Sequence, residues 1–153
     1  MFTFYTHAKL FTPFAEIEPG VVVVSQEGRI LYAGPAGEAP QVAGEEIDLG
    51  GRVLAPGFID VHVHGGMGVS FGESGDALEE LRRYSAWVTG AGVTGYICSL
   101  AAADRQALLE LVRAYASALD ASAADPGWAG AEPLGIHLEG PYLNPEKKGA
   151  FNP

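Results

Sequence analysis

Residues 54–66 read LAPGFIDVHVHGG and place two histidines, His62 and His64, one residue apart at the end of an apolar run. Because successive side chains of a strand point to opposite faces, a strand here would direct both imidazoles to one face, together with Asp60. The glycine pair that follows allows a sharp turn and a close approach of the backbone to a ligand. Neutral imidazole is a common metal ligand, so the stretch predicts either a metal-binding strand end or two ordinary histidines.

The chain alternates between strand and helix patterns from residue 54 onwards. The predicted elements are strands over 54–65, 93–100 and 133–141 and helices over 76–89 and 105–120. Repeated alternation of this kind predicts parallel β/α units and therefore an α/β fold. In parallel β/α barrels the active site lies at the C-terminal ends of the strands, which is where His62 and His64 fall.

Both predicted helices carry an apolar stripe that we expect to pack in a core. The stripes consist of Leu78, Leu81, Ser85 and Val88 in the first helix and Leu108, Leu111, Val112, Tyr115 and Leu119 in the second. Trp87 and Trp128 are expected in the core as well. Either Ser74 or Asp76 could cap the first helix, and Asp104 could cap the second.

Residues 1–53 have a different texture, with short strand patterns and no helical period. FTFYTHAKLF at 2–11 and VVVV at 21–24 read as strands, and a turn over 25–28 predicts a hairpin to the next strand. A polar stretch with glycine and proline, 35–46, reads as a loop. We therefore expect two domains, residues 1–53 and residues 54–153.

Composition narrows the possible functions. The chain has 153 residues, 48% of them hydrophobic, and a formal net charge of −10 with only nine lysines and arginines. Nucleic acid binding, which relies on clustered cations, is disfavoured. No apolar stretch has the length of a membrane helix, and the N-terminus lacks the pattern of a secretory signal. With Cys98 as the single cysteine, no intrachain disulfide can form, so we expect a cytoplasmic protein without a membrane partner.

A second group of polar residues lies in GIHLEGPYLNPEKKGAFNP, residues 135–153. Alternation along the predicted strand places His137 and Glu139 on one face. A carboxylate beside His62 and His64 would complete a metal site with two nitrogen ligands and one oxygen ligand. The alternative is an ion pair between Glu139 and Lys147 or Lys148 at the surface. His137 is expected to orient Glu139 or to fill the interior, not to bind the metal itself.

HLEGPYLNPEKKGAFNP at 137–153, with PGFIDVHVHGG at 56–66, resembles the N-acetylglucosamine-6-phosphate deacetylases of the amidohydrolase superfamily. The resemblance runs from about residue 45 to Pro153. It implies the start of a (β/α)8 TIM barrel preceded by part of a small β-sandwich domain. It also implies hydrolysis of N-acetylglucosamine 6-phosphate to glucosamine 6-phosphate and acetate.

The resemblance assigns a role to individual residues. Glu139 corresponds to the metal ligand that members share, and His62 and His64 correspond to ligands of a second metal position. One or two divalent ions are implied, with zinc or iron expected. Ala150 and Phe151 fall in the segment that contacts the substrate sugar, although many members have histidine where Phe151 stands. The family also implies a phosphorylated amino sugar as substrate and a homodimer of the full-length protein.

Several expected parts of the active site are absent from this sequence. The family's catalytic Asp and two further histidine ligands would lie beyond Pro153, since a complete barrel takes about 250 residues. We therefore expect an N-terminal fragment that is inactive alone. One alternative is another amidohydrolase, such as a dihydroorotase or hydantoinase, but these usually have a bridging lysine. A second alternative is a non-catalytic metal-binding module that ends near Pro153.

Overall fold

The computed structural model describes residues 1–101, 104–140 and 142–149. The chain divides into two compact units, Met1–Pro56 and Gly57–Pro153. The first unit is formed almost entirely of strands, and the second alternates strands and helices. Among the described residues, no helix is long and apolar enough to cross a membrane.

The first unit is a five-stranded sheet. Its strands are β1 (Phe2–Phe11), β2 (Glu16–Val24), β3 (Ile30–Pro35), β4 (Gly44–Asp48) and β5 (Val53–Leu54). β2 and β3 form the predicted antiparallel hairpin, and the order across the sheet is β3-β2-β1-β4, with β5 also pairing with β1. Valines 21–23 of β2 are buried, as expected of an apolar strand. The loop predicted over 35–46 is wrong at its end, because residues from Gly44 pair in parallel with β1.

The second unit contains two long helices and a parallel sheet. Its elements are β6 (Phe58–Val63), β7 (Gly65–Gly66), β8 (Val69–Ser70), α1 (Ala77–Val88), β9 (Val93–Leu100), α2 (Arg105–Ala124) and β10 (Glu132–Leu138), with short 3-10 turns at Thr89–Ala91 and Pro145–Lys147. A 3-10 turn at Ala36–Glu38 belongs to the first unit. β6, β9 and β10 pair in parallel in the order β10-β9-β6. The alternation that predicted parallel β/α units is confirmed.

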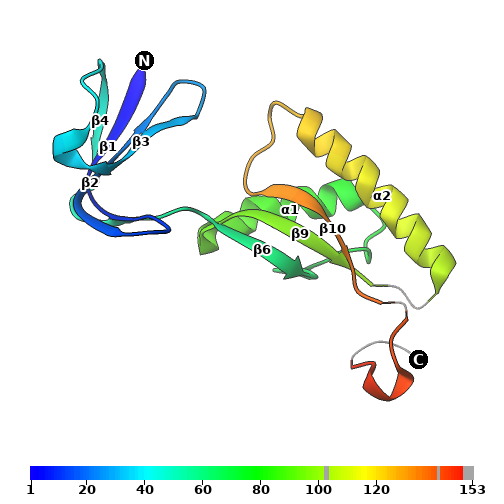
Figure 1. The fold of residues 1–153 in the computed structure, drawn as a ribbon. Helices are drawn as coiled ribbons and strands as arrows, with labels where there is room; N and C mark the ends of the chain where they lie inside the picture. The colour runs from blue at the N-terminus through cyan, green and yellow to red at the C-terminus, as the bar shows by residue number, and fades with distance from the viewer. Residues whose placement is uncertain (102–103, 141, 150–153) are drawn as a thin grey trace. The chain divides into compact units, whose positions relative to one another are not determined.

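Both helices pack against one face of this sheet (Figure 1). Alternate residues of β9, namely Tyr96, Cys98 and Leu100, are fully buried there. They meet Leu81 of α1 and Tyr115 of α2 in one apolar cluster. The period of two in the strand and of 3.6 in the helices thus brings the predicted stripes together.

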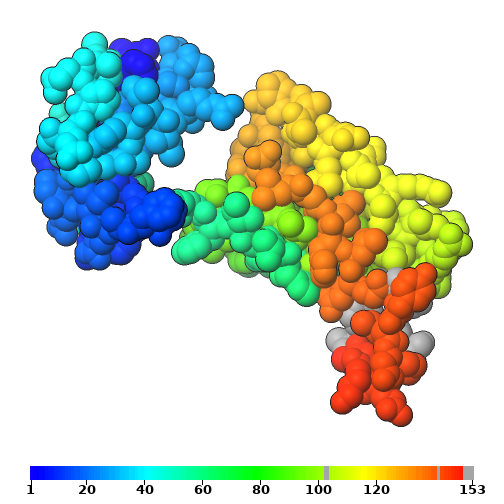
Figure 2. Space-filling view, in the orientation of Figure 1, coloured from blue at the N-terminus to red at the C-terminus, as the bar shows by residue number. Residues whose placement is uncertain are grey.

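The opposite face of the sheet carries exposed side chains. Ile59 of β6 and Leu134 of β10 are exposed large hydrophobic residues, and the chain of β6 and β10 is visible at the surface in Figure 2. Parallel sheets are normally covered on both faces, and this exposed, partly hydrophobic face resembles a face that is normally covered.

The structure departs from the sequence predictions at the start of a strand, at the end of a helix and at one tryptophan. The strand expected from Leu54 begins at Phe58, because Leu54 pairs with β1 and Pro56 interrupts the strand pattern. α2 continues to Ala124, beyond the predicted helix over 105–120. Trp87 is 43% exposed, so its expected place in the core is wrong, whereas Trp128 packs against the core.

Candidate metal centre

A bulge in β6 decides which way its polar side chains point. The register pairs Asp60 with Tyr96 and Val63 with Cys98, so β6 has one residue more than β9 in this interval. Asp60 therefore lies on the helix-covered face with Tyr96, and the expectation that it shares a face with the histidines is wrong. Burial raises the pKa of the nearby Tyr84 hydroxyl, and the negative charge of Asp60 raises it further. Its carboxylate accepts a hydrogen bond of 3.1 Å from the His62 backbone N–H, which holds the bulge.

Three predicted ligands converge at the C-terminal ends of the parallel strands. Nε2 of His62 and Nε2 of His64 lie 3.0 and 2.7 Å from the same Oε2 of Glu139. The two Nε2 atoms are 3.4 Å apart. Among the described residues, these three form the one group of His, Cys, Asp or Glu whose ligand atoms are close enough to hold a metal ion.

The donor set fits a divalent metal ion. Four-coordinate zinc with bonds of about 2.0–2.2 Å holds neighbouring ligand atoms about 3.3–3.5 Å apart. The two histidine nitrogens have this separation, and the carboxylate oxygen lies closer, at hydrogen-bond distance. The side chains of His62, His64 and Glu139 are 51%, 49% and 32% exposed, so an ion can reach them.

Glu139 reaches the histidines across the end of β9, the central strand. Its backbone N–H donates to the Leu100 carbonyl, which extends the pairing of β10 with β9 by one residue. The hydrogen bond from His62 is the largest effect on the pKa of the Glu139 carboxyl and lowers it. Burial opposes it, but the hydrogen bond from His64 adds to the lowering, so the pKa lies below its ordinary value. The ionised carboxylate is the form that binds a metal ion.

His137 supports the site from the neighbouring strand position. Its Nδ1 lies 3.0 Å from the hydroxyl of Ser99, which is itself buried in β9. Its ring lies 4.7 Å from the ring of His62, centroid to centroid. His137 therefore packs against a candidate ligand and lies outside the three-residue group. That it does not bind the metal itself stays a prediction.

The chain leaves His64 through a tight hairpin formed by β7 and β8. Gly65 has φ of +127°, and a Cβ at this position would lie 2.2 Å from the Val69 carbonyl oxygen, so only glycine fits. The Phe71 N–H then donates to the His64 carbonyl at 2.9 Å. The turn predicted from the glycine pair is present, and a backbone hydrogen bond connects its far end to His64.

Sequence reasoning missed the residue that anchors this hairpin. Glu80 of α1 is 3% exposed and accepts hydrogen bonds from the backbone N–H groups of Gly72 and Ser74 and from the Tyr115 hydroxyl. Burial alone would raise the pKa of the Glu80 carboxyl, but these hydrogen bonds outweigh it and lower the pKa. The one signal in the sequence was that Glu80 directly precedes Leu81, a residue of the predicted apolar stripe of this helix.

A cavity of about 510 Å³ opens beside two of the three candidate ligands, His64 and Glu139. Its walls include His64, Ser70, Ala101, Glu139, Lys147 and Lys148. Ala150 and Phe151, predicted to contact substrate, lie outside the described residues. The cavity thus joins the candidate metal ligands to a segment with two lysines, and it has room for a ligand larger than water.

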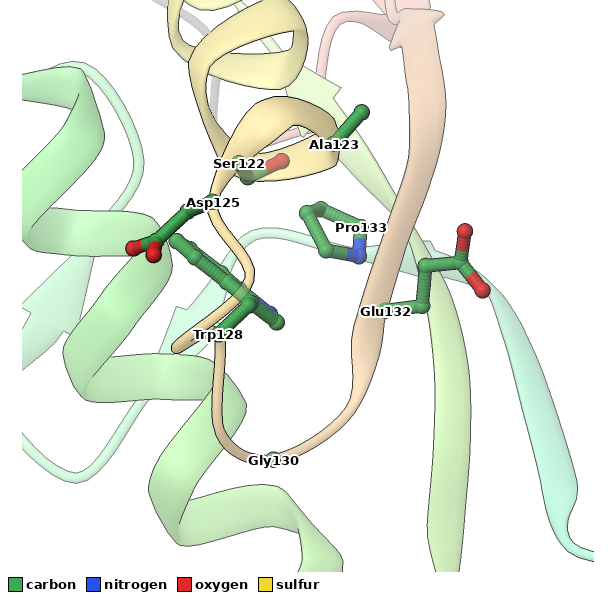
Figure 3. Close-up of a pocket in the computed structure, with 7 residues that line it drawn as sticks. All are labelled: Ser122, Ala123, Asp125, Trp128, Gly130, Glu132 and Pro133. Carbon is green, nitrogen blue, oxygen red and sulfur yellow. The ribbon is translucent and has the colours of Figure 1, made fainter. Parts of the chain in front are cut away.

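A second hollow, of about 310 Å³, lies at the start of β10, near the end of α2. Figure 3 shows that the carboxylates of Asp125 and Glu132 point away from each other there. Asp125 forms an ion pair of 2.8 Å with Arg82, whose guanidinium also lies over the Trp128 ring. The hollow therefore lacks converging ligands.

Cys98 has the structural role expected from the sequence. It is fully buried in the core of the second unit, and burial raises the pKa of its thiol to about 12. A thiol protonated at neutral pH is a poor nucleophile.

No protein-family model matches the chain. The human N-acetylglucosamine-6-phosphate deacetylase is 38% identical over 119 residues, which make up 74% of this chain and 26% of that protein. An imidazolonepropionase from Methylobacterium sp. (strain 4-46) is 36% identical over 118 residues, 69% of this chain and 28% of that protein.

A solved structure extends the similarity to nearly the whole chain. The crystal structure of N-acetylglucosamine-6-phosphate deacetylase from Pasteurella multocida matches 99% of this chain and 38% of that one, with a TM-score of 0.76 and 27% identity. The chain spans about a quarter of the length of the curated deacetylases that it matches. By sequence and by fold, the chain is homologous to the corresponding part of N-acetylglucosamine-6-phosphate deacetylases.

Proposed function

We propose that this chain carries the first part of the active site of a metal-dependent N-acetylglucosamine-6-phosphate deacetylase. The reaction would convert N-acetylglucosamine 6-phosphate and water to glucosamine 6-phosphate and acetate. The observation that carries the proposal is the convergence of two imidazoles and one carboxylate from strands far apart in the sequence. Homology to deacetylases supports the choice of reaction.

We also propose that residues 54–153 form the first β/α units of a (β/α)8 barrel and that residues 1–53 form part of a β-sandwich domain. Three parallel strands with two helices on one face support the barrel. The exposed face of this sheet, which carries His62 and His137, would be the barrel interior. The candidate ligands lie at the C-terminal strand ends, where barrel enzymes have their active sites.

His62, His64 and Glu139 would hold one or two divalent ions, zinc or iron. A bound divalent ion polarises an amide carbonyl and lowers the pKa of its bound water. The chain's own contribution is to keep both imidazoles on one face, with Asp60 holding the bulge, and to keep Glu139 ionised through its histidine hydrogen bonds before the ion binds. His137 would keep the His62 ring from turning, since it packs on that ring and is fixed by Ser99.

The phosphorylated amino sugar would occupy the cavity beside His64 and Glu139, with Ala150 and Phe151 at its sugar. Lys147 and Lys148 line the same cavity and supply positive charge suited to an anionic substrate. Protonation of the leaving amine would need an aspartate that residues 1–153 do not supply, so these residues alone would not turn over. A homodimer of the complete protein and a cytoplasmic location, consistent with the single cysteine, complete the proposal.

The test is an assay of the complete native polypeptide with N-acetylglucosamine 6-phosphate, in which released glucosamine 6-phosphate is measured. We expect activity that a chelator removes, that zinc or iron(II) restores, and that Glu139→Gln lowers at least about a hundredfold, since loss of an outer partner alone costs 10–100-fold. His7→Ala, in the first unit, is the control and should keep full activity. Turnover of imidazolonepropionate in place of the amino sugar would instead assign the site to the other matching amidohydrolase.

A further inference from the structure

We infer that Glu80 is a positioning residue for the metal ligand His64, acting through the backbone of residues 70–74. The inference rests on the proposed metal centre. Glu80 does not contact the ligands itself; its two carboxylate oxygens hold the segment that closes the hairpin after His64. Its role would be to fix where the His64 backbone lies, and therefore where the imidazole points.

The first step is that Glu80 is fully committed to this segment. One oxygen, Oε1, accepts from the Ser74 N–H at 2.7 Å. The other, Oε2, accepts from the Gly72 N–H at 2.9 Å and from the Tyr115 hydroxyl. The Gly72 N–H is also 2.8 Å from the Tyr115 oxygen. A buried carboxylate with only hydrogen-bond donors around it is stable in its charged form and holds those donors strongly.

The second step is that this segment is fastened to His64. Phe71, next to Gly72, donates its N–H to the His64 carbonyl, and Ser70 pairs with Gly65 in the hairpin. The Phe71 ring is held in the core, where it packs against Tyr84, Tyr96 and Tyr115. Movement of residues 70–72 therefore moves the backbone of the ligand.

The third step is that the same segment forms a wall of the cavity. Ser70 lines the cavity together with His64 and Glu139. Metal ligands generally depend on outer partners that set their orientation, and loss of such a partner typically costs 10–100-fold in metal affinity. A buried glutamate that only stabilised the fold would not have this specific effect.

The experiment compares two buried polar residues of α1 in the complete native polypeptide. Glu80→Gln keeps the size of the side chain but presents an amide N–H₂ to groups that are themselves donors. Ser85→Ala is the matched control, because Ser85 is equally buried, but its hydroxyl hydrogen-bonds the Tyr96 hydroxyl at 3.0 Å and not the backbone of residues 70–74. Zinc affinity is measured by competition with a chromophoric chelator, and hydrogen–deuterium exchange of residues 64–74 is measured without metal.

We expect Glu80→Gln to weaken zinc binding about tenfold and to speed exchange in residues 64–74, while Ser85→Ala leaves both unchanged even if it lowers the unfolding midpoint. Wild-type zinc affinity in Glu80→Gln, or equal losses in both variants, would overturn the inference. If the wild type binds neither zinc nor iron(II), the metal centre is wrong and the inference falls with it. Faster exchange in Glu80→Gln would then report only the coupling of the hairpin to α1.

Discussion

Glu80 and Glu139 are two glutamates of the same unit with opposite surroundings. Glu80 is buried, and its partners are backbone N–H groups and a tyrosine hydroxyl, all of which are donors. Glu139 is about one-third exposed, and its partners are two imidazole nitrogens that can themselves bind a cation. The pKa of both carboxyls is lowered, but by different kinds of neighbour.

The difference separates a structural carboxylate from a ligand carboxylate. A buried carboxylate surrounded by donors has all the hydrogen bonds it needs, and the protein loses stability when it is removed. An exposed carboxylate that shares its space with other lone-pair groups is held less firmly, and a cation satisfies all three groups at once. A lowered pKa by itself does not distinguish these two cases.

The distinction between Glu80 and Glu139 is tested most strongly by removing each carboxylate in turn. Glu80→Ala would leave the Ser74 N–H and the buried Tyr115 hydroxyl without their acceptor and would remove one of the two acceptors of the Gly72 N–H, so we expect a loss of about 3 kcal/mol in the free energy of unfolding. Glu139→Ala in the metal-free protein should change the free energy of unfolding much less, by about 0.5 kcal/mol, because this carboxylate is partly exposed to solvent. Urea unfolding of the complete, metal-free protein measures both, and equal losses would contradict the distinction.

A smaller loss of stability is expected from changes in the β7–β8 hairpin, which lies between the candidate ligand His64 and the segment held by Glu80. Gly65→Ala would place a Cβ 2.2 Å from the Val69 carbonyl oxygen at a φ of +127°, and we expect a cost of about 2 kcal/mol together with weaker zinc binding. Gly68, at the tip of the same hairpin, has φ of +76° but nothing within 4 Å of a Cβ.

Gly68→Ala is therefore the matched control, with a cost of about 1 kcal/mol and no change in zinc affinity. Unfolding in urea and zinc competition are measured on both variants. If Gly68→Ala weakened zinc binding as much as Gly65→Ala, the close contact at Gly65 would not be what positions the ligand.

The sequence predicted the elements of the second unit well where its periods were clear. The strand over 93–100 and the caps at Asp76 and Asp104 are present, because a buried β-strand and capped amphipathic helices have strong local signals. The candidate ligands were also predictable, since strand alternation and the histidine spacing are local. Their meeting with Glu139 depended on the parallel order of three strands, which the repeated β/α pattern implied.

The misses share a cause, which is that the deciding contact is distant in sequence. The bulge that turns Asp60 to the helix side depends on how β6 pairs with β9, and a period of two cannot show it. Glu80 reads as a surface glutamate because its partners, Gly72 and Ser74, belong to a loop whose path no period fixes. The last turn of α2 has mainly alanine, which favours a helix but leaves no apolar stripe.

The smallest effect should come from acid, which changes only the charge of Glu80 and removes no atoms. The native pKa of Glu80 is lowered below 4.5, so its contribution to stability is present above pH 4.5 and is lost as the pH falls through the native pKa. The difference in unfolding free energy between the wild type and Glu80→Gln should therefore be constant near neutral pH. It should shrink below pH 4.5 by at most about 1.4 kcal/mol per pH unit for the one proton taken up. Urea unfolding from pH 3 to pH 7 measures this difference, with the exposed Glu79→Gln on the same helix as control. If the difference in unfolding free energy stayed constant down to pH 3, the hydrogen bonds of Glu80 would not depend on its charge. The lowered pKa that Glu80 shares with Glu139 would then have no energetic consequence.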